Sequence, residues 1–132
     1  MDVIILIAAM QAGIAVPAQP IVQRAVERLD MTSFPNSLNN AGGPGRRTLR
    51  QLGRHRFAWS DGELEVTEAD GSWVRMFRPL RAPRGRIQLC FTDQAQNGGT
   101  YMTSGAIELT PARNGLYRAR EIRHRDCERY AR

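Results

Sequence analysis

Three carboxylates alternate along one short stretch of the chain: Asp61, Glu63 and Glu65. The Asp61-Gly62 pair is typical of a hairpin turn, so the two glutamates fall on one face of the strand that follows. Residues two apart on a strand lie about 7 Å from one another, within the range that inverting glycosidases use for their acid and base. A general acid also needs burial to raise its pKa, whereas this alternation is typical of a solvated strand face. A small hydrolase using these carboxylates is therefore the alternative hypothesis for function.

Histidine and serine offer a second form of that alternative. His55 alternates with Phe57 and Trp59, which places it on an apolar strand face as a core or rim residue. No serine lies in a Gly-x-Ser-x-Gly nucleophile elbow. The residues available for a serine–histidine pair are Ser60, Ser72, Ser104, His55 and His124. A hydrolase site centred on His55 stays open, but we assign no catalytic residue.

The two cysteines of the chain, Cys90 and Cys127, do not form a Cys-x-x-Cys motif, which argues against a redox role. Together with the two histidines they also lack the ligand spacing of a metal site, so we expect neither a metal nor a cofactor. In an exported protein an even pair of cysteines most simply forms one disulfide. A loop of about 37 residues closed in this way stabilises the fold by roughly 3.8 kcal/mol in the chain-entropy model. The bond is expected to hold residues 123–132 against a sheet.

The compartment is read from the N-terminus, where an apolar run extends from Val3 to Val16 and is broken by Gln11 and Gly13. A membrane-spanning helix needs about 20 apolar residues, so the run fits a signal peptide better than a span. Small residues in Val16-Pro17-Ala18 place the cleavage after Ala18 and predict a periplasmic or secreted protein. Because no Lys or Arg precedes the run, an uncleaved apolar anchor and a buried cytosolic element remain alternatives.

All 19 basic residues are arginines, and the formal net charge is +6. The absence of lysine excludes Schiff-base and Ser-Lys chemistry, while the positive charge favours anionic partners. Aromatic residues are too sparse to predict specific nucleic-acid binding. The cluster that we expect to contact an anionic partner is Arg46, Arg47, Arg50, Arg54 and Arg56. Two further clusters are Arg78, Arg81, Arg84 and Arg86, and Arg118, Arg120, Arg123 and Arg125.

The elements that would position these residues form one domain over 19–132 after a signal peptide over 1–18. An amphipathic helix is predicted for 19–32, with Pro20 suited to its first turn, followed by a loop over 33–47. From 48 to 132 apolar residues recur with period two between turn signals. The pattern predicts a mainly β fold, an antiparallel meander of about seven short strands that closes into a small barrel or sandwich.

These features together predict a small exported, disulfide-containing domain that binds a partner and performs no catalysis. Its positive charge points to an anionic envelope component or an acidic protein as that partner.

Export gives the first test. We expect periplasmic or culture protein to have the intact mass of residues 19–132, because cleavage after Ala18 removes the apolar run. Intact-mass spectrometry of each cell fraction measures this. A full-length mass found only in the cytosol would contradict the prediction.

Overall fold

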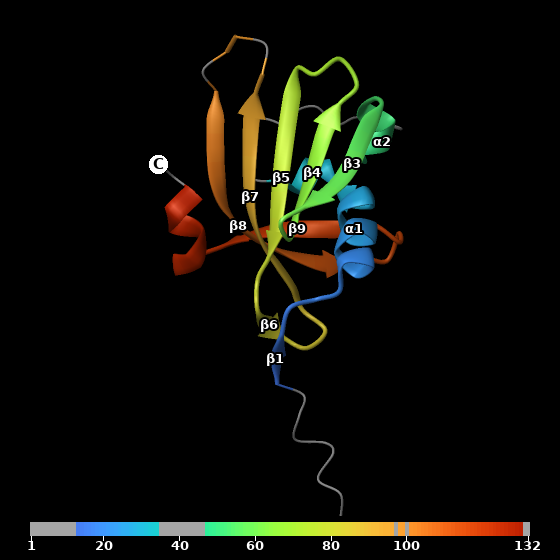
Figure 1. The fold of residues 1–132 in the computed structure, drawn as a ribbon. Helices are drawn as coiled ribbons and strands as arrows, with labels where there is room; N and C mark the ends of the chain where they lie inside the picture. The colour runs from blue at the N-terminus through green and yellow to red at the C-terminus, as the bar shows by residue number, and fades with distance from the viewer. Residues whose placement is uncertain (1–12, 35–46, 97, 100, 131–132) are drawn as a thin grey trace, which may run out of the picture.

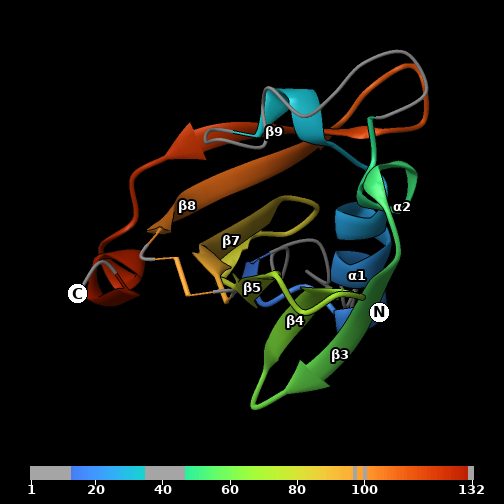
Figure 2. The same cartoon turned by 90° about the horizontal axis from the view of Figure 1, so that it is seen from above.

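The computed structural model describes residues 13–34, 47–96, 98–99 and 101–130. Seven strands form one curled sheet, a half-barrel, in the order β2-β9-β8-β7-β5-β4-β3 (Figures 1 and 2). The predicted mainly β class is confirmed. The strands of this sheet are β2 (Leu29–Asp30), β3 (His55–Ser60), β4 (Glu63–Glu68), β5 (Trp73–Pro79), β7 (Ile87–Ala95), β8 (Met102–Pro111) and β9 (Tyr117–Ile122). The remaining elements are β1 (Ile14–Ala15), α1 (Gln19–Glu27), η2 (Met31–Ser33), α2 (Leu49–Leu52), β6 (Ala82–Pro83) and η4 (Arg125–Tyr130).

Tight turns produce the antiparallel part of the sheet. Asp61 and Gly62 have φ angles of 51° and 75°, the positive values that a two-residue type I′ turn requires, and they join β3 to β4 with Ser60 opposite Glu63. The same period-two alternation that predicts the strands directs apolar side chains to the concave face. That face contributes Leu64, Val66, Phe77, Leu89, Phe91, Ile107 and Leu109 to the main core.

Helix α1 packs on this core and lies at the open side of the curl, beside β3 (Figure 2). Its buried residues are Val22, Ala25 and Val26, and Pro20 lies in its first turn. The helix is shorter than the predicted 19–32 segment, because Leu29 and Asp30 pair in parallel with Tyr117 and Arg118 of β9. The predicted loop over 33–47 lies mostly outside the described residues.

The predicted closure into a barrel or sandwich is wrong. The sheet ends at β2 on one side and at β3 on the other, and these two strands do not pair with each other. Among the described residues, the only other ladder is the two-residue pairing of β1 with β6. The helix occupies the side that a further strand pairing would have closed.

A single continuous strand, β8, runs from Met102 to Pro111. Gly105 interrupts the apolar alternation in the sequence and resembles a break, but it lies inside the strand opposite Phe91. A Cβ at this position would meet Cε1 of Phe91 at 3.2 Å. The glycine therefore makes room for an aromatic ring of the core and does not end a strand.

The residues just before α1 belong to the fold even though the predicted signal peptide includes them. Ile14 and Ala15 form β1, which pairs with Pro83 and Ala82, and the carbonyl of Ala18 accepts hydrogen bonds from the first turn of α1. Within the described part of the chain, no helix is long and apolar enough to cross a membrane.

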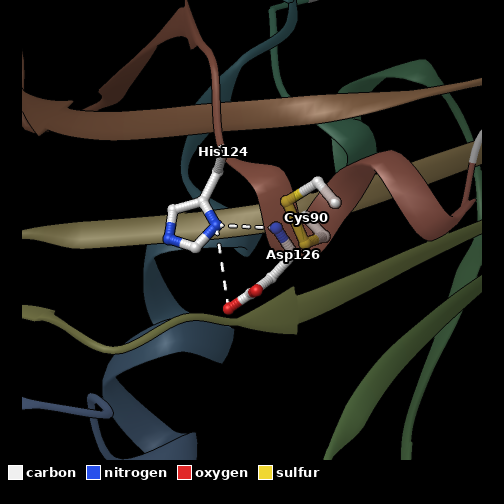
Figure 3. Close-up of a disulfide and its surroundings, with 4 residues drawn as sticks. Cys90, His124 and Asp126 are labelled. Carbon is white, nitrogen blue, oxygen red and sulfur yellow. Dashed lines mark hydrogen bonds and ion pairs between the residues drawn. A yellow bond between two sulfur atoms is a disulfide. The ribbon is translucent and has the colours of Figure 1, made fainter.

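The predicted disulfide between Cys90 and Cys127 is confirmed (Figure 3). It joins the convex face of β7 to η4, with a Cα–Cα distance of 5.2 Å. Around it a second apolar cluster contains Leu80, Ala106 and Ile122. The C-terminal turn is thereby held on the outside of the sheet.

Replacing Cys127 with Ser tests this role. We expect the free energy of unfolding to fall by about 2–4 kcal/mol, because the 37-residue separation no longer restricts the unfolded chain. Urea unfolding measures the loss, and reduction of the wild-type protein is expected to reproduce it. A reductant that destabilises the Cys127→Ser variant as strongly as the wild type would contradict this account.

Candidate functional site

The three carboxylates of the hydrolase hypothesis lie at the β3–β4 hairpin. Asp61 is exposed in the turn, and Glu63 and Glu65 are half-buried on the convex face of β4. Glu65 accepts a hydrogen bond of 3.2 Å from the hydroxyl of Thr67. None of the three is buried in the way that a general acid requires.

His55 lies on the concave face, and its side chain is only 2% exposed, as expected for a core or rim residue. Its Nε2 atom is 3.9 Å from Oε1 of Glu68, and its Nδ1 atom is 3.1 Å from the carbonyl oxygen of Gly53. The hydroxyl of Ser72 donates to Oε2 of the same Glu68 at 2.8 Å. The serine thus faces a carboxylate, whereas nucleophile activation requires an imidazole beside the hydroxyl.

The second histidine lies next to the disulfide (Figure 3). Ser104 and His124 line the same hollow of about 230 Å³, but the backbone N–H of Asp126 donates to Nδ1 of His124 at 3.2 Å. Nδ1 is therefore the acceptor, which assigns the ring proton of the neutral form to Nε2. In a catalytic triad the arrangement is the reverse, with Nδ1 donating and Nε2 free to take the serine proton.

Buried charged side chains that the sequence pattern was not used to predict lie beside His55 and Glu68 on the concave face. Arg75 and Asp93 lie opposite each other on β5 and β7, with side chains 1% and 0% exposed. The guanidinium is 3.6 Å from Asp93 and 3.4 Å from Glu68. The sequence contains a signal for this burial, because Arg75 is two residues from Phe77 and Asp93 is two residues from Phe91. Residues two apart share a strand face, so both charged residues lie on the face of the core. We read this group as a buried ion-pair network that holds three strands together.

The arginine cluster predicted to bind an anionic partner is distributed over several elements. Arg46 lies outside the described residues, and Arg47 and Arg54 are exposed at either end of α2. Arg56 is exposed on the convex face of β3. Arg50 faces α1, where it pairs with Glu27 at 3.2 Å and lies 5.8 Å from the centre of the Phe57 ring.

Two arginines of the third cluster are also paired with carboxylates. Arg118 lies 3.6 Å from Asp30, and Arg120 donates to Glu108 at 3.1 Å. Glu108 accepts a second hydrogen bond of 2.8 Å from Gln88. The hydrogen bond from Gln88, with those of Arg120 and the nearby charge of Arg86, holds the pKa of Glu108 below its usual value.

A groove of about 590 Å³ lies between α1 and β3 on the described surface, and we call it the α1–β3 groove. Trp59 of β3 forms one side. The helix and the residue after it supply the rest, which is Gln19, Pro20, Gln23, Arg24, Glu27 and Arg28.

A chain of hydrogen bonds fixes the tryptophan in this groove. The indole Nε1–H of Trp59 donates to Oε1 of Gln23 at 2.9 Å, and the amide of Gln23 donates to Glu27 at 3.1 Å. Glu27 is in turn paired with Arg50. The aromatic ring is therefore positioned before any ligand arrives, which lowers the entropy cost of binding.

The groove also carries positive charge. Arg24 and Arg28 are four residues apart and both line it, and neither forms an ion pair with the part of the chain that the structure describes. The one carboxylate in the lining, Glu27, is neutralised by Arg50. An aromatic ring beside two available guanidinium groups can hold a ligand that has both an apolar face and an acidic group.

Sequence reasoning missed this groove. The alternation of His55, Phe57 and Trp59 indicates only an apolar strand face, and the amphipathic pattern of the helix does not indicate which strand its polar side borders. The helical spacing of Gln23 with Glu27 and of Arg24 with Arg28 was visible, but the partner strand was not.

The chain matches no protein-family model, no curated protein and no solved structure.

The low pKa of Glu108 predicts a pH dependence of stability. Because the folded pKa lies below the ordinary value of 4.5, Glu108 stabilises the fold above that pH and loses this effect as pH falls through the folded pKa. We expect Glu108→Gln to be less stable than the wild type at pH 7, with the difference shrinking at lower pH. Urea unfolding between pH 3 and pH 7 measures this. A difference that grows on acidification would contradict the assignment.

Proposed function

We propose that the protein is an exported, disulfide-containing binding domain whose α1–β3 groove takes an acidic saccharide of the cell envelope. The observation that carries the proposal is the position of Trp59, held by Gln23 beside the arginines Arg24 and Arg28.

The chemistry of the groove fits such a ligand. The apolar C–H face of a pyranose ring can pack on an indole, as apolar surfaces do on aromatic side chains generally. A uronic-acid carboxylate matches the planar guanidinium group, which binds carboxylates through two parallel hydrogen bonds. The net positive charge of the chain adds attraction for an acidic polymer at a distance.

Two features support the envelope as the compartment. Disulfides persist in oxidising compartments and are rare in the cytosol, and this domain has one between β7 and η4. The apolar run from Val3 to Val16 has the length of a signal-peptide core. The acidic saccharide is the form of anionic envelope component that the groove favours over an acidic protein.

Binding is favoured over hydrolysis. A glycosidase needs two carboxylates on opposite sides of the scissile bond. The described lining of the groove contains one, Glu27, and that carboxylate is engaged by Arg50. The hydrolase candidates Asp61, Glu63 and Glu65 lie on the same β3–β4 hairpin as Trp59, but none of them lines the groove.

Calorimetric titration with an oligomer of uronic acid tests the proposal. We expect Arg24→Gln with Arg28→Gln to weaken binding at least about tenfold, because each guanidinium–carboxylate bond contributes about 1.5–3 kcal/mol. The matched control is Arg123→Gln with Arg125→Gln, which removes the same charge from exposed positions that do not line the groove.

The control pair is expected to retain binding within about twofold, since removing distant charge changes only screened, long-range attraction. A neutral oligomer of the same length is expected to bind more weakly than the acidic one. Equal losses for both double variants would show that only net charge matters, and a folded wild-type protein that ignores the acidic oligomer would refute the proposal.

A further inference from the structure

One end of the molecule combines exposed apolar side chains with arginines. It contains β1 and β6, which lie together below the main sheet in Figure 1, with the turn that follows β6. Val16, Ile21 and Arg81 border these strands, and we call the whole surface the β6 end. Ile14, Val16 and Ile21 are 61%, 55% and 53% exposed there. Scattered apolar residues are normal on a surface, but Val16 and Ile21 line one groove and Ile14 lies next to it in β1, which marks an interaction site.

That groove has a volume of about 390 Å³ and an apolar lining. Val16, Pro17 and Ile21 form one side, and Ile87 and Leu109 form part of the other. Arg84 and Arg86 belong to the same lining, so charged groups border an apolar hollow.

The arginines of the β6 end are available for an external partner. Arg81, Arg84 and Arg86 are exposed, and none forms an ion pair with the residues that the structure describes. Two acidic residues lie near: Asp126, which shares a hollow with Arg81, and Glu108, which is already bonded to Gln88 and Arg120.

We propose that the β6 end docks on an anionic phospholipid bilayer. Apolar side chains enter the interface between headgroups and acyl chains, while arginines bind lipid phosphates at the surface. Basic residues beside a bilayer gain from its negative surface potential, which makes the charge complementary to this end.

The position of the N-terminal apolar run favours the same occupant. Of residues 3–12 only Gln11 is polar, and the described chain begins at Gly13, directly before β1. Any association of that run with a bilayer brings the β6 end to the membrane surface. This proposal applies to the uncleaved chain, the alternative in which the apolar run stays as an anchor, because cleavage after Ala18 would remove Ile14 and Val16 from this end. A membrane-bound protein with the intact mass of residues 19–132 would contradict it. The proposal is independent of saccharide binding in the α1–β3 groove.

A second copy of the chain is a poorer occupant of this end. A two-fold contact would place Arg81, Arg84 and Arg86 against the same three arginines of the other copy. Like charges brought together in this way oppose association.

Sedimentation of the full chain with vesicles tests the proposal. We expect stronger binding to vesicles of equal parts phosphatidylcholine and phosphatidylglycerol than to phosphatidylcholine alone. Replacing Arg81, Arg84 and Arg86 together with Gln is expected to weaken binding to the anionic vesicles at least about tenfold. Ile21→Ser is expected to weaken it too, because this side chain is exposed and leaves the core unchanged.

The control replaces Arg56, Arg123 and Arg125 with Gln, which removes the same charge from exposed positions that do not line the groove of the β6 end. It is expected to retain binding within about threefold, because salt screens the attraction between a bilayer and charges that lie far from its surface. Equal losses for the two triple variants would overturn the proposal in favour of net charge alone. Binding that no β6-end variant changes would overturn it in favour of the N-terminal run alone. Unchanged binding of uronic-acid oligomers by the β6-end triple variant separates this outcome from that of the proposed function.

Discussion

The structure depends on the packing of α1 against the concave face of an open sheet. A curled sheet that does not close leaves its inner face exposed along one side, and the fully buried Val22, Ala25 and Val26 cover it. The helix is also attached to the sheet near both of its edge strands, β2 and β3. After α1 the chain enters β2 and pairs with β9, while Gln23 bonds to Trp59 on β3. The helix therefore joins the two edges of the half-barrel, and the α1–β3 groove exists because a helix stands where strand pairing would otherwise have sealed the surface.

The two faces of the sheet are stabilised by different means. On the concave face, Arg75 forms ion pairs with Glu68 and Asp93 beside the apolar core. The buried guanidinium needs both carboxylates, because desolvation of an unpaired charge is costly. On the convex face the disulfide holds η4 over β7 and β8, with Leu80, Ala106 and Ile122 around it. A domain of this size buries a smaller share of its unfolded-chain surface than a large one does, so a covalent link on the convex face supplements the core.

The sequence predicts what local chemistry controls and misses what distant contacts decide. Asp61-Gly62 specifies a hairpin through its own backbone preferences, and two cysteines leave one pairing.

Leu29 continues the helical period and is predicted as part of a helix, yet pairing with Tyr117, far along the chain, makes it a strand. Gly105 has the local character of a break, and only the ring of Phe91 on the neighbouring strand explains it. Trp59 has the alternation of a core residue, and the partner that positions it, Gln23, is 36 residues away. The candidate site was missed for the same reason as the fold details, since it is assembled between two elements.

The two proposed binding surfaces both include residues of α1, so they lie next to each other on the molecule. Gln19 and Pro20, at the start of α1, line the α1–β3 groove, whereas Ile21 lines the hollow of the β6 end. Successive helix residues point about 100° apart, so one turn supplies both surfaces in different directions. A domain with its β6 end on a bilayer would hold the groove close to the membrane surface, because both surfaces share the first turn of α1. The two proposals are compatible with each other, since no residue that lines one hollow also lines the other.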